Sequence, residues 1–94
     1  MNITKSEQEL KAKLYRDFNL NTVRELNHSL DEQIRRLTID LSHCKLVDSE
    51  AIIFLDRWLR SGNKLELRNP PEIFNEIIEL LKLDQIWDLS EILK

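Results

Sequence analysis

The chain has 94 residues, of which 41% are hydrophobic and 33% are charged, and its net charge is −3. This length predicts one domain spanning residues 1–94 with a single core. Lys and Arg do not gather into a stripe, so we expect no nucleic-acid partner. No segment has the apolar length of a signal peptide or a membrane span, and we therefore expect a cytoplasmic protein that does not insert into a membrane.

The first half of the chain shows two periodicities. Every second residue is apolar in residues 10–14 and again in residues 37–41, which predicts two half-buried strands. Residues 1–4 are expected to pair with the first of these as a hairpin. Between the strands we predict a helix capped by Asn21 or Thr22. Its apolar residues recur at helical spacing: Val23, Leu26, Leu30 and Ile34.

A second helix is predicted to begin at Asp48 or Ser49, both good N-cap residues, and to end near Ser61, where Gly62 favours termination. On a helical projection one broad arc of this helix is apolar and faces the core. The residues of that arc are Ala51, Ile52, Phe54, Leu55, Trp58 and Leu59.

The remaining chain predicts a third strand at residues 64–68 and a third helix opened by Asn69-Pro70-Pro71. We expect the buried face of that helix to consist of Ile73, Phe74, Ile77, Leu80 and Leu81. A short terminal helix is expected over residues 89–94. Strands and helices thus alternate, which favours an α/β fold with a mainly parallel sheet.

Two residues near the start of the second helix are candidates for function. Ser49 is either the helix N-cap or a phosphorylation site, where a phosphate would meet the free N–H groups and positive dipole of the helix end. Ile53 falls on the solvent side among Asp56, Arg57 and Arg60, which makes it either an ordinary exposed isoleucine or a partner contact.

The order of these segments resembles the STAS family, whose best-known members are bacterial anti-sigma factor antagonists. The resemblance covers nearly the whole chain. It is carried by residues 18–22, by Leu37-Thr38-Ile39-Asp40-Leu41-Ser42, by Leu46-Val47-Asp48-Ser49, by Gly62 with Leu65-Glu66-Leu67, and by the segment from Asn69-Pro70-Pro71 to Leu83. It implies a small, mostly parallel mixed sheet of four to five strands, with three to four helices packed beside it.

The resemblance also implies a mechanism. In the antagonists, the unmodified protein binds an anti-sigma kinase and thereby frees a sigma factor. The kinase phosphorylates the serine directly after the turn aspartate, and this phosphorylation breaks the complex between antagonist and kinase. By position that serine is Ser49 and the preceding acid is Asp48. We therefore expect a regulatory protein-binding surface, with Ser49 as its phosphorylation site. Its residues are Asn19, Asp48, Ser49, Glu50, Ile53 and Arg57.

The chain departs from the family pattern at two positions of this turn and at one position before the first helix. The usual sequence is Asp-Ser-Ser/Thr-Gly, whereas this chain has Glu50 and Ala51 after Ser49, and Asn19 stands where the antagonists commonly carry an aspartate. Glu50 places a charge beside the proposed phosphosite, and Ala51 adds a methyl group where glycine would admit a partner. An alternative function is therefore a STAS adaptor without a phosphoswitch, docking on a transporter ATPase or a signalling complex.

Catalysis, metal binding and cofactor binding are not expected. Asp40, Ser42 and His43 are neighbours at a strand end, so their side chains diverge and nothing supplies an oxyanion hole. One glycine cannot build a phosphate loop, and no His, Cys or Asp cluster has metal-ligand spacing. Cys44 is expected to be a small buried hydrophobe, and Glu72, Glu76 and Glu79 a solvated helix face.

Overall fold

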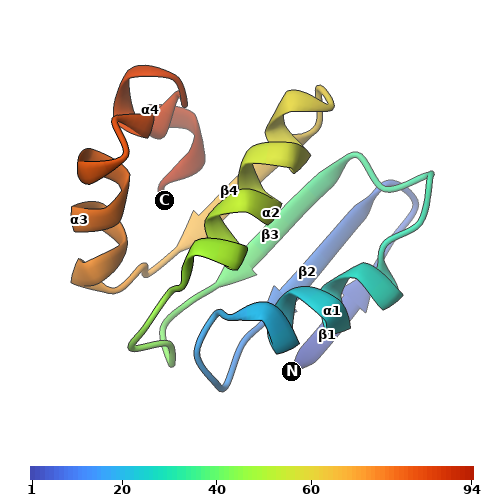
Figure 1. The fold of residues 1–94 in the computed structure, drawn as a ribbon. Coiled ribbons are helices and arrows are strands. Elements are labelled where there is room, and N and C mark those ends of the chain that lie inside the picture. Colours follow the sequence, from blue (N-terminus) through green and yellow to red (C-terminus); the bar gives the residue numbers. More distant parts are fainter.

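Four strands form one sheet, and the helices cover one of its faces and one edge (Figure 1). The computed structural model describes all 94 residues. The strands are β1 (Asn2–Lys5), β2 (Glu9–Lys13), β3 (Arg36–Asp40) and β4 (Lys64–Arg68). The helices are α1 (Leu20–Ser29), α2 (Ser49–Arg60), α3 (Glu72–Leu80) and α4 (Leu89–Ile92), with a single 3-10 turn η1 (Leu83–Gln85).

The strands lie in the order β1-β2-β3-β4. β1 and β2 form an antiparallel hairpin, while β2, β3 and β4 are parallel and are joined by crossovers through α1 and α2. This arrangement confirms the predicted α/β fold, including the N-terminal hairpin and the mixed, mostly parallel sheet.

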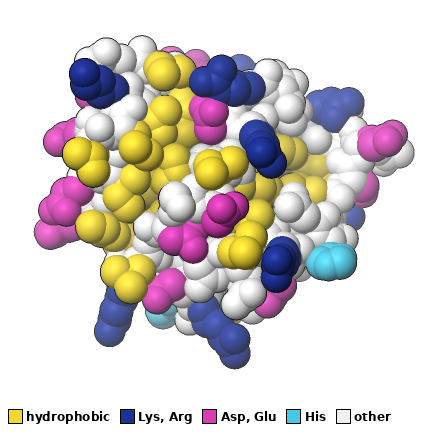
Figure 2. All heavy atoms as spheres, viewed as in Figure 1, with side chains coloured by type: hydrophobic (Ala, Val, Ile, Leu, Met, Phe, Trp, Pro, Cys, Tyr) yellow, Lys and Arg dark blue, Asp and Glu magenta, His cyan; other side chains and the backbone are white.

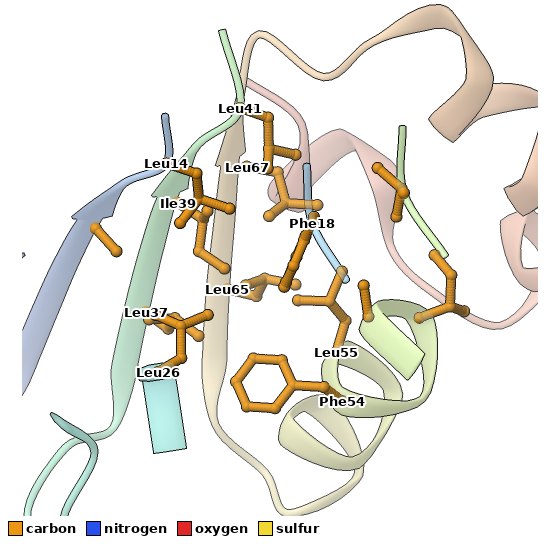
Figure 3. Packing of buried hydrophobic residues seen from close by; sticks show 14 of the residues in the cluster. Leu14, Phe18, Leu26, Leu37, Ile39, Leu41, Phe54, Leu55, Leu65 and Leu67 are labelled. Atoms are coloured by element: carbon orange, nitrogen blue, oxygen red, sulfur yellow. The ribbon is translucent and has the colours of Figure 1, made fainter. Parts of the chain in front are cut away.

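The core lies between the sheet and the helices (Figure 3). Alternation along each strand sends one set of side chains toward α1 and α2, where they are buried. That set comprises Leu10, Ala12, Leu37, Ile39, Leu65 and Leu67. The opposite set is almost entirely polar, so the other face of the sheet is open to solvent.

The cap predicted for α1 is wrong by two or three residues. Asn19 is the N-cap, and its side-chain oxygen accepts a hydrogen bond from the backbone N–H of Thr22 at 3.2 Å. Thr22 is buried inside the first turn, where its hydroxyl donates to the carbonyl of Asp17 at 2.7 Å. α1 also ends at Ser29, so Ile34 reaches the core from the loop after the helix.

The predicted buried face of α3 is correct only in part. Phe74 is fully buried, and Ile73 and Ile77 are half-buried, but Leu80 and Leu81 are exposed by 80% and 51%. Ile78, which the prediction omitted, is buried instead. The core covers one side of the apolar arc of α3, and Ile77 packs against its margin, but Leu80 and Leu81 lie outside it.

The chain ends differently from the predicted helix over residues 89–94. α4 stops at Ile92, and Leu93 then forms a parallel bridge with Leu67 of β4. The N–H of Lys94 donates to the carbonyl of Leu67 at 3.0 Å. The last residues therefore begin to pair with the free edge of the sheet. None of the helices combines the length and the apolar character that crossing a membrane requires.

Candidate docking site at the start of α2

Two loops that are distant in the sequence are joined at the start of α1 and α2. Phe18 and Val47 form a parallel bridge, in which the N–H of Phe18 donates to the carbonyl of Leu46 and the N–H of Asp48 donates to the carbonyl of Phe18, both at 3.0 Å. The N-terminal ends of the two helices therefore lie side by side (Figure 1).

Asp17 stabilises this junction by hydrogen bonds, and Phe18 stabilises it by packing into the core. One carboxylate oxygen of Asp17 accepts the backbone N–H groups of Lys45 and Leu46, each at 3.1 Å. The Phe18 ring is completely buried and meets Phe54 of α2 edge-to-face, with 6.3 Å between the ring centroids. The loop geometry is thus built into the core and does not depend on a partner.

The structure shows which residue of the turn before α2 is the helix N-cap. From the sequence, either Asp48 or Ser49 could have filled that position. Asp48 is the N-cap, and its carboxylate accepts the N–H of Ala51 at 3.0 Å. Ser49 is the first residue of the helix and is exposed, and its hydroxyl has no hydrogen-bond partner. The interpretation of Ser49 as the cap is therefore wrong, and its hydroxyl is free for another use.

The departures from the family turn also have a structural outcome. Ala51 is completely buried, so its methyl group packs into the core and does not face an approaching protein. The argument that Ala51 obstructs a partner is therefore wrong. Glu50 is exposed directly beside Ser49 and remains the one departure on this turn that a partner would meet.

A shallow groove of about 320 Å³ runs between α1 and α2. Val23 and Asn27 line it from α1, and Glu50, Ile53 and Arg57 line it from α2. Ile53 is 43% exposed, as the helical projection predicted. Trp58 and Leu59, which were placed on the core face of α2, are half-buried.

Two exposed apolar side chains beside the turn were not predicted. Leu46 is 61% exposed and Leu20 is 37% exposed. Leu46 and Val47 are consecutive residues of an extended segment, in which neighbouring side chains point to opposite sides. Because Val47 is buried, Leu46 faces outward. The sequence could have indicated this, since two consecutive apolar residues of an extended segment cannot both face the core.

We name the whole surface the α1–α2 face. It combines apolar side chains for contact with polar groups at two helix ends. Of the six predicted site residues, Glu50, Ile53 and Arg57 line the groove, Asn19 and Asp48 cap the two helices, and Ser49 begins α2. The residues of the α1–α2 face are Asn19, Leu20, Leu46, Asp48, Ser49, Glu50, Ile53 and Arg57.

Replacing Asp48 with alanine is expected to lower the free energy of unfolding by about 1 kcal/mol, because the N–H of Ala51 loses its acceptor. Chemical denaturation measures this loss. Asp48→Asn is the matched control, since asparagine caps helices about as well as aspartate. A stability for Asp48→Ala equal to that of the wild type would show that the cap contributes nothing.

Other chemical groups are already occupied by structural contacts. Burial, reinforced by the nearby carboxylates of Asp17 and Asp40, raises the pKa of the Cys44 thiol to about 11, and that thiol donates to the carbonyl of Arg16 at 2.9 Å. Cys44 is thus a buried small side chain, as predicted. The carboxylate of Asp40 accepts the N–H of Ser42 at 2.9 Å, and this bond lowers its pKa. His43 stacks on Tyr15 with the rings 5.4 Å apart.

The family model described as "Mlab, STAS domain" matches residues 1–93, which is essentially the whole chain. A search of curated proteins returned no match.

Proposed function

The chain belongs to the STAS domain family, and we propose that it is a regulatory module that binds an anti-sigma kinase-type partner through the α1–α2 face and is switched by phosphorylation of Ser49. Domains of this family are regulatory modules that mediate protein–protein interaction. Our proposal adds the surface, the kind of partner and the switch, and it assigns the chain a binding role in the cytoplasm without catalysis.

The observation that carries the proposal is the free, exposed hydroxyl of Ser49 on the first turn of α2. Because Asp48 supplies the cap, Ser49 can be modified without removing a hydrogen bond that holds the helix. A phosphate at this position would add about two negative charges to the α1–α2 face. Leu46 and Ile53 are exposed nearby, so a partner that buries them would have to desolvate those charges.

We infer the kind of partner from the anti-sigma factor antagonists that the chain resembles. A kinase that binds the unmodified α1–α2 face has Ser49 within its reach, and transfer of phosphate to Ser49 would end its own complex. Such a cycle couples the binding of this chain to the ATP supply of the cell and thereby regulates transcription or a related signalling output.

The test uses the full chain as bait and its purified partner for affinity measurements. We expect Ser49→Asp and Ile53→Asp each to weaken binding at least 100-fold, because each places a carboxylate within the contact. Ser49→Ala should bind normally but accept no phosphate from the kinase, as seen by mass spectrometry. Ile86→Asp is the matched control, since Ile86 is also exposed but lies in another part of the fold. Wild-type affinity in both Ser49→Asp and Ile53→Asp would refute the proposed surface.

A second candidate function is a STAS adaptor without a switch, docked on a transporter ATPase through the same face. The observation that favours it is the exposed Glu50 directly after Ser49. Because Glu50 already makes this face acidic, a phosphate on Ser49 changes its charge relatively less. Like-charge repulsion from Glu50 also opposes the transfer of phosphate to Ser49. This function predicts that native Ser49 carries no phosphate and that Ser49→Asp still binds, while Ile53→Asp does not.

A further inference from the structure

α3 carries more apolar surface than the core covers. At about 100° per residue, its apolar residues span an arc of about 160°. Phe74 and Ile78 occupy the side of the arc that is buried. The other side holds four residues, of which two are half-buried and two are exposed. We name these the α3 stripe: Ile73, Ile77, Leu80 and Leu81.

Residues at spacings of three and four along a helix lie next to each other, so the α3 stripe is continuous from Ile73 through Ile77 to Leu80 and Leu81. Its most exposed member, Leu80, is 80% accessible to solvent. Figure 2 shows hydrophobic side chains gathered over the part of the surface that α3 occupies in Figure 1. Contiguous apolar surface of this kind marks interaction sites on soluble domains.

The border of the α3 stripe is acidic. Glu72, Glu76 and Glu79 follow Leu80 around the helix, and all three are exposed, as the sequence predicted. Residues 69–94 contain six acidic residues and two lysines, a net charge of −4, although the whole chain has a net charge of only −3. The negative charge of the protein is therefore concentrated in the part that carries the stripe.

The acidic border helps to decide what binds the α3 stripe: a second copy of the chain, a lipid surface or a segment of another protein. In a two-fold dimer the same patch meets itself, so two acidic borders would be brought together and would repel each other. An anionic lipid surface would be repelled in the same way. A protein segment with apolar side chains flanked by lysine or arginine satisfies both the stripe and its border.

We propose that the α3 stripe is a second docking surface, which binds a basic amphipathic helix of a partner protein. Apolar side chains of that helix pack on Ile77, Leu80 and Leu81, and its basic residues lie against Glu76 and Glu79. α3 and α1 lie on opposite sides of α2 (Figure 1). One chain can therefore hold two partners at once, one on the α1–α2 face and one on the α3 stripe.

The experiment uses a synthetic 14-residue peptide with leucine at helical spacing and lysine at the remaining positions, titrated into the full chain by calorimetry. We expect saturable 1:1 binding that weakens as salt is raised. The Leu80→Ser/Leu81→Ser variant should bind at least tenfold more weakly, because it removes the two most exposed apolar contacts. Glu76→Gln/Glu79→Gln should bind more weakly and with a smaller salt dependence.

Three controls keep the result specific. Leu46→Ser carries the same kind of change on the α1–α2 face and should bind like the wild type, as should Ile86→Ser. A peptide of identical composition in scrambled order should not bind. Equal affinity in Leu80→Ser/Leu81→Ser and the wild type would overturn the proposal. A chain that dimerises in sedimentation and loses dimerisation in that variant would also overturn it, because the occupant would then be a second copy.

Discussion

The variant Phe18→Ala is expected to lower the free energy of unfolding by about 3–5 kcal/mol, the usual cost of removing a fully buried phenylalanine. Phe18 is 0% exposed and packs edge-to-face on Phe54 of α2. Its backbone also carries both backbone hydrogen bonds of the bridge between the two loops of the α1–α2 face. The cavity left by the ring lies directly below that junction, so we expect the docking surface to loosen as well as the core.

Urea denaturation and amide hydrogen exchange measure the two effects separately. The urea midpoint should fall with an unchanged slope, since the unfolded surface is nearly the same. Exchange at the amides of Phe18 and Asp48 should accelerate by more than the global change in stability explains. Leu46→Ala is the matched control, because Leu46 belongs to the same bridge but is exposed, and we expect it to change stability by less than about 0.5 kcal/mol. An equal loss in the two variants would show that the ring does not anchor the junction.

The strands and the mainly parallel sheet could be predicted from the sequence because the strands alternate between apolar and polar residues. One face of the sheet is covered and the other is solvated, so a period of two survives in residues 10–14 and 37–41 without competing signals. Phe18, in contrast, lies in a loop without periodicity. Its partner Val47 is 29 positions away, and nothing local in either segment specifies that they pair.

The helix starts show where local signals are ambiguous. Asn19, Asn21 and Thr22 are all N-cap residue types within four positions, and propensity alone does not select among them. Burial of Thr22 against Asp17 selects Asn19. The same ambiguity arose between Asp48 and Ser49, and it bears directly on function, because only the residue that is not the cap has a free side chain.

The end of the chain was predicted least well. An amphipathic pattern identifies the apolar arc of α3 but does not state how much of that arc the core reaches, so Leu80 and Leu81 were wrongly placed inside. Trp87 follows a left-handed residue, Lys82, and a single 3-10 turn, and its indole N–H bonds to Asp56 of α2, 31 positions earlier in the chain. The anchor of the C-terminal segment was therefore not visible in any sequence pattern.

That anchor leads to the second large effect, which we expect in Trp87→Ala. Trp87 is 6% exposed, and its indole N–H donates to a carboxylate oxygen of Asp56 on α2 at 3.1 Å. Removing the whole side chain should lower the free energy of unfolding by about 3–5 kcal/mol. Trp87→Phe keeps most of the apolar contact and loses the hydrogen bond, so about 1 kcal/mol is expected from a partly solvated carboxylate.

The pH dependence of Trp87→Phe tests the hydrogen bond itself. Partial burial alone would raise the pKa of Asp56, but the bonds from Trp87 and Arg60 outweigh it and lower that pKa. A lowered folded pKa adds stability above the unfolded pKa, and this stability is lost as the pH falls through the folded value. Trp87→Phe should therefore lose less stability than the wild type between neutral pH and about pH 3, below the ordinary aspartate pKa of about 4.

Urea denaturation at neutral and acidic pH, followed by circular dichroism, measures all of these differences. Ile86→Ala is the matched control for Trp87→Ala, since the adjacent Ile86 is 63% exposed and should contribute less than about 0.5 kcal/mol. When Asp56→Ala is introduced into both Trp87→Phe and the wild type, the two proteins should show the same pH dependence of stability. Neither of them then has the hydrogen bond between residues 87 and 56. If Trp87→Ala costs no more than Ile86→Ala, the C-terminal segment is held by its pairing with β4 and not by the indole.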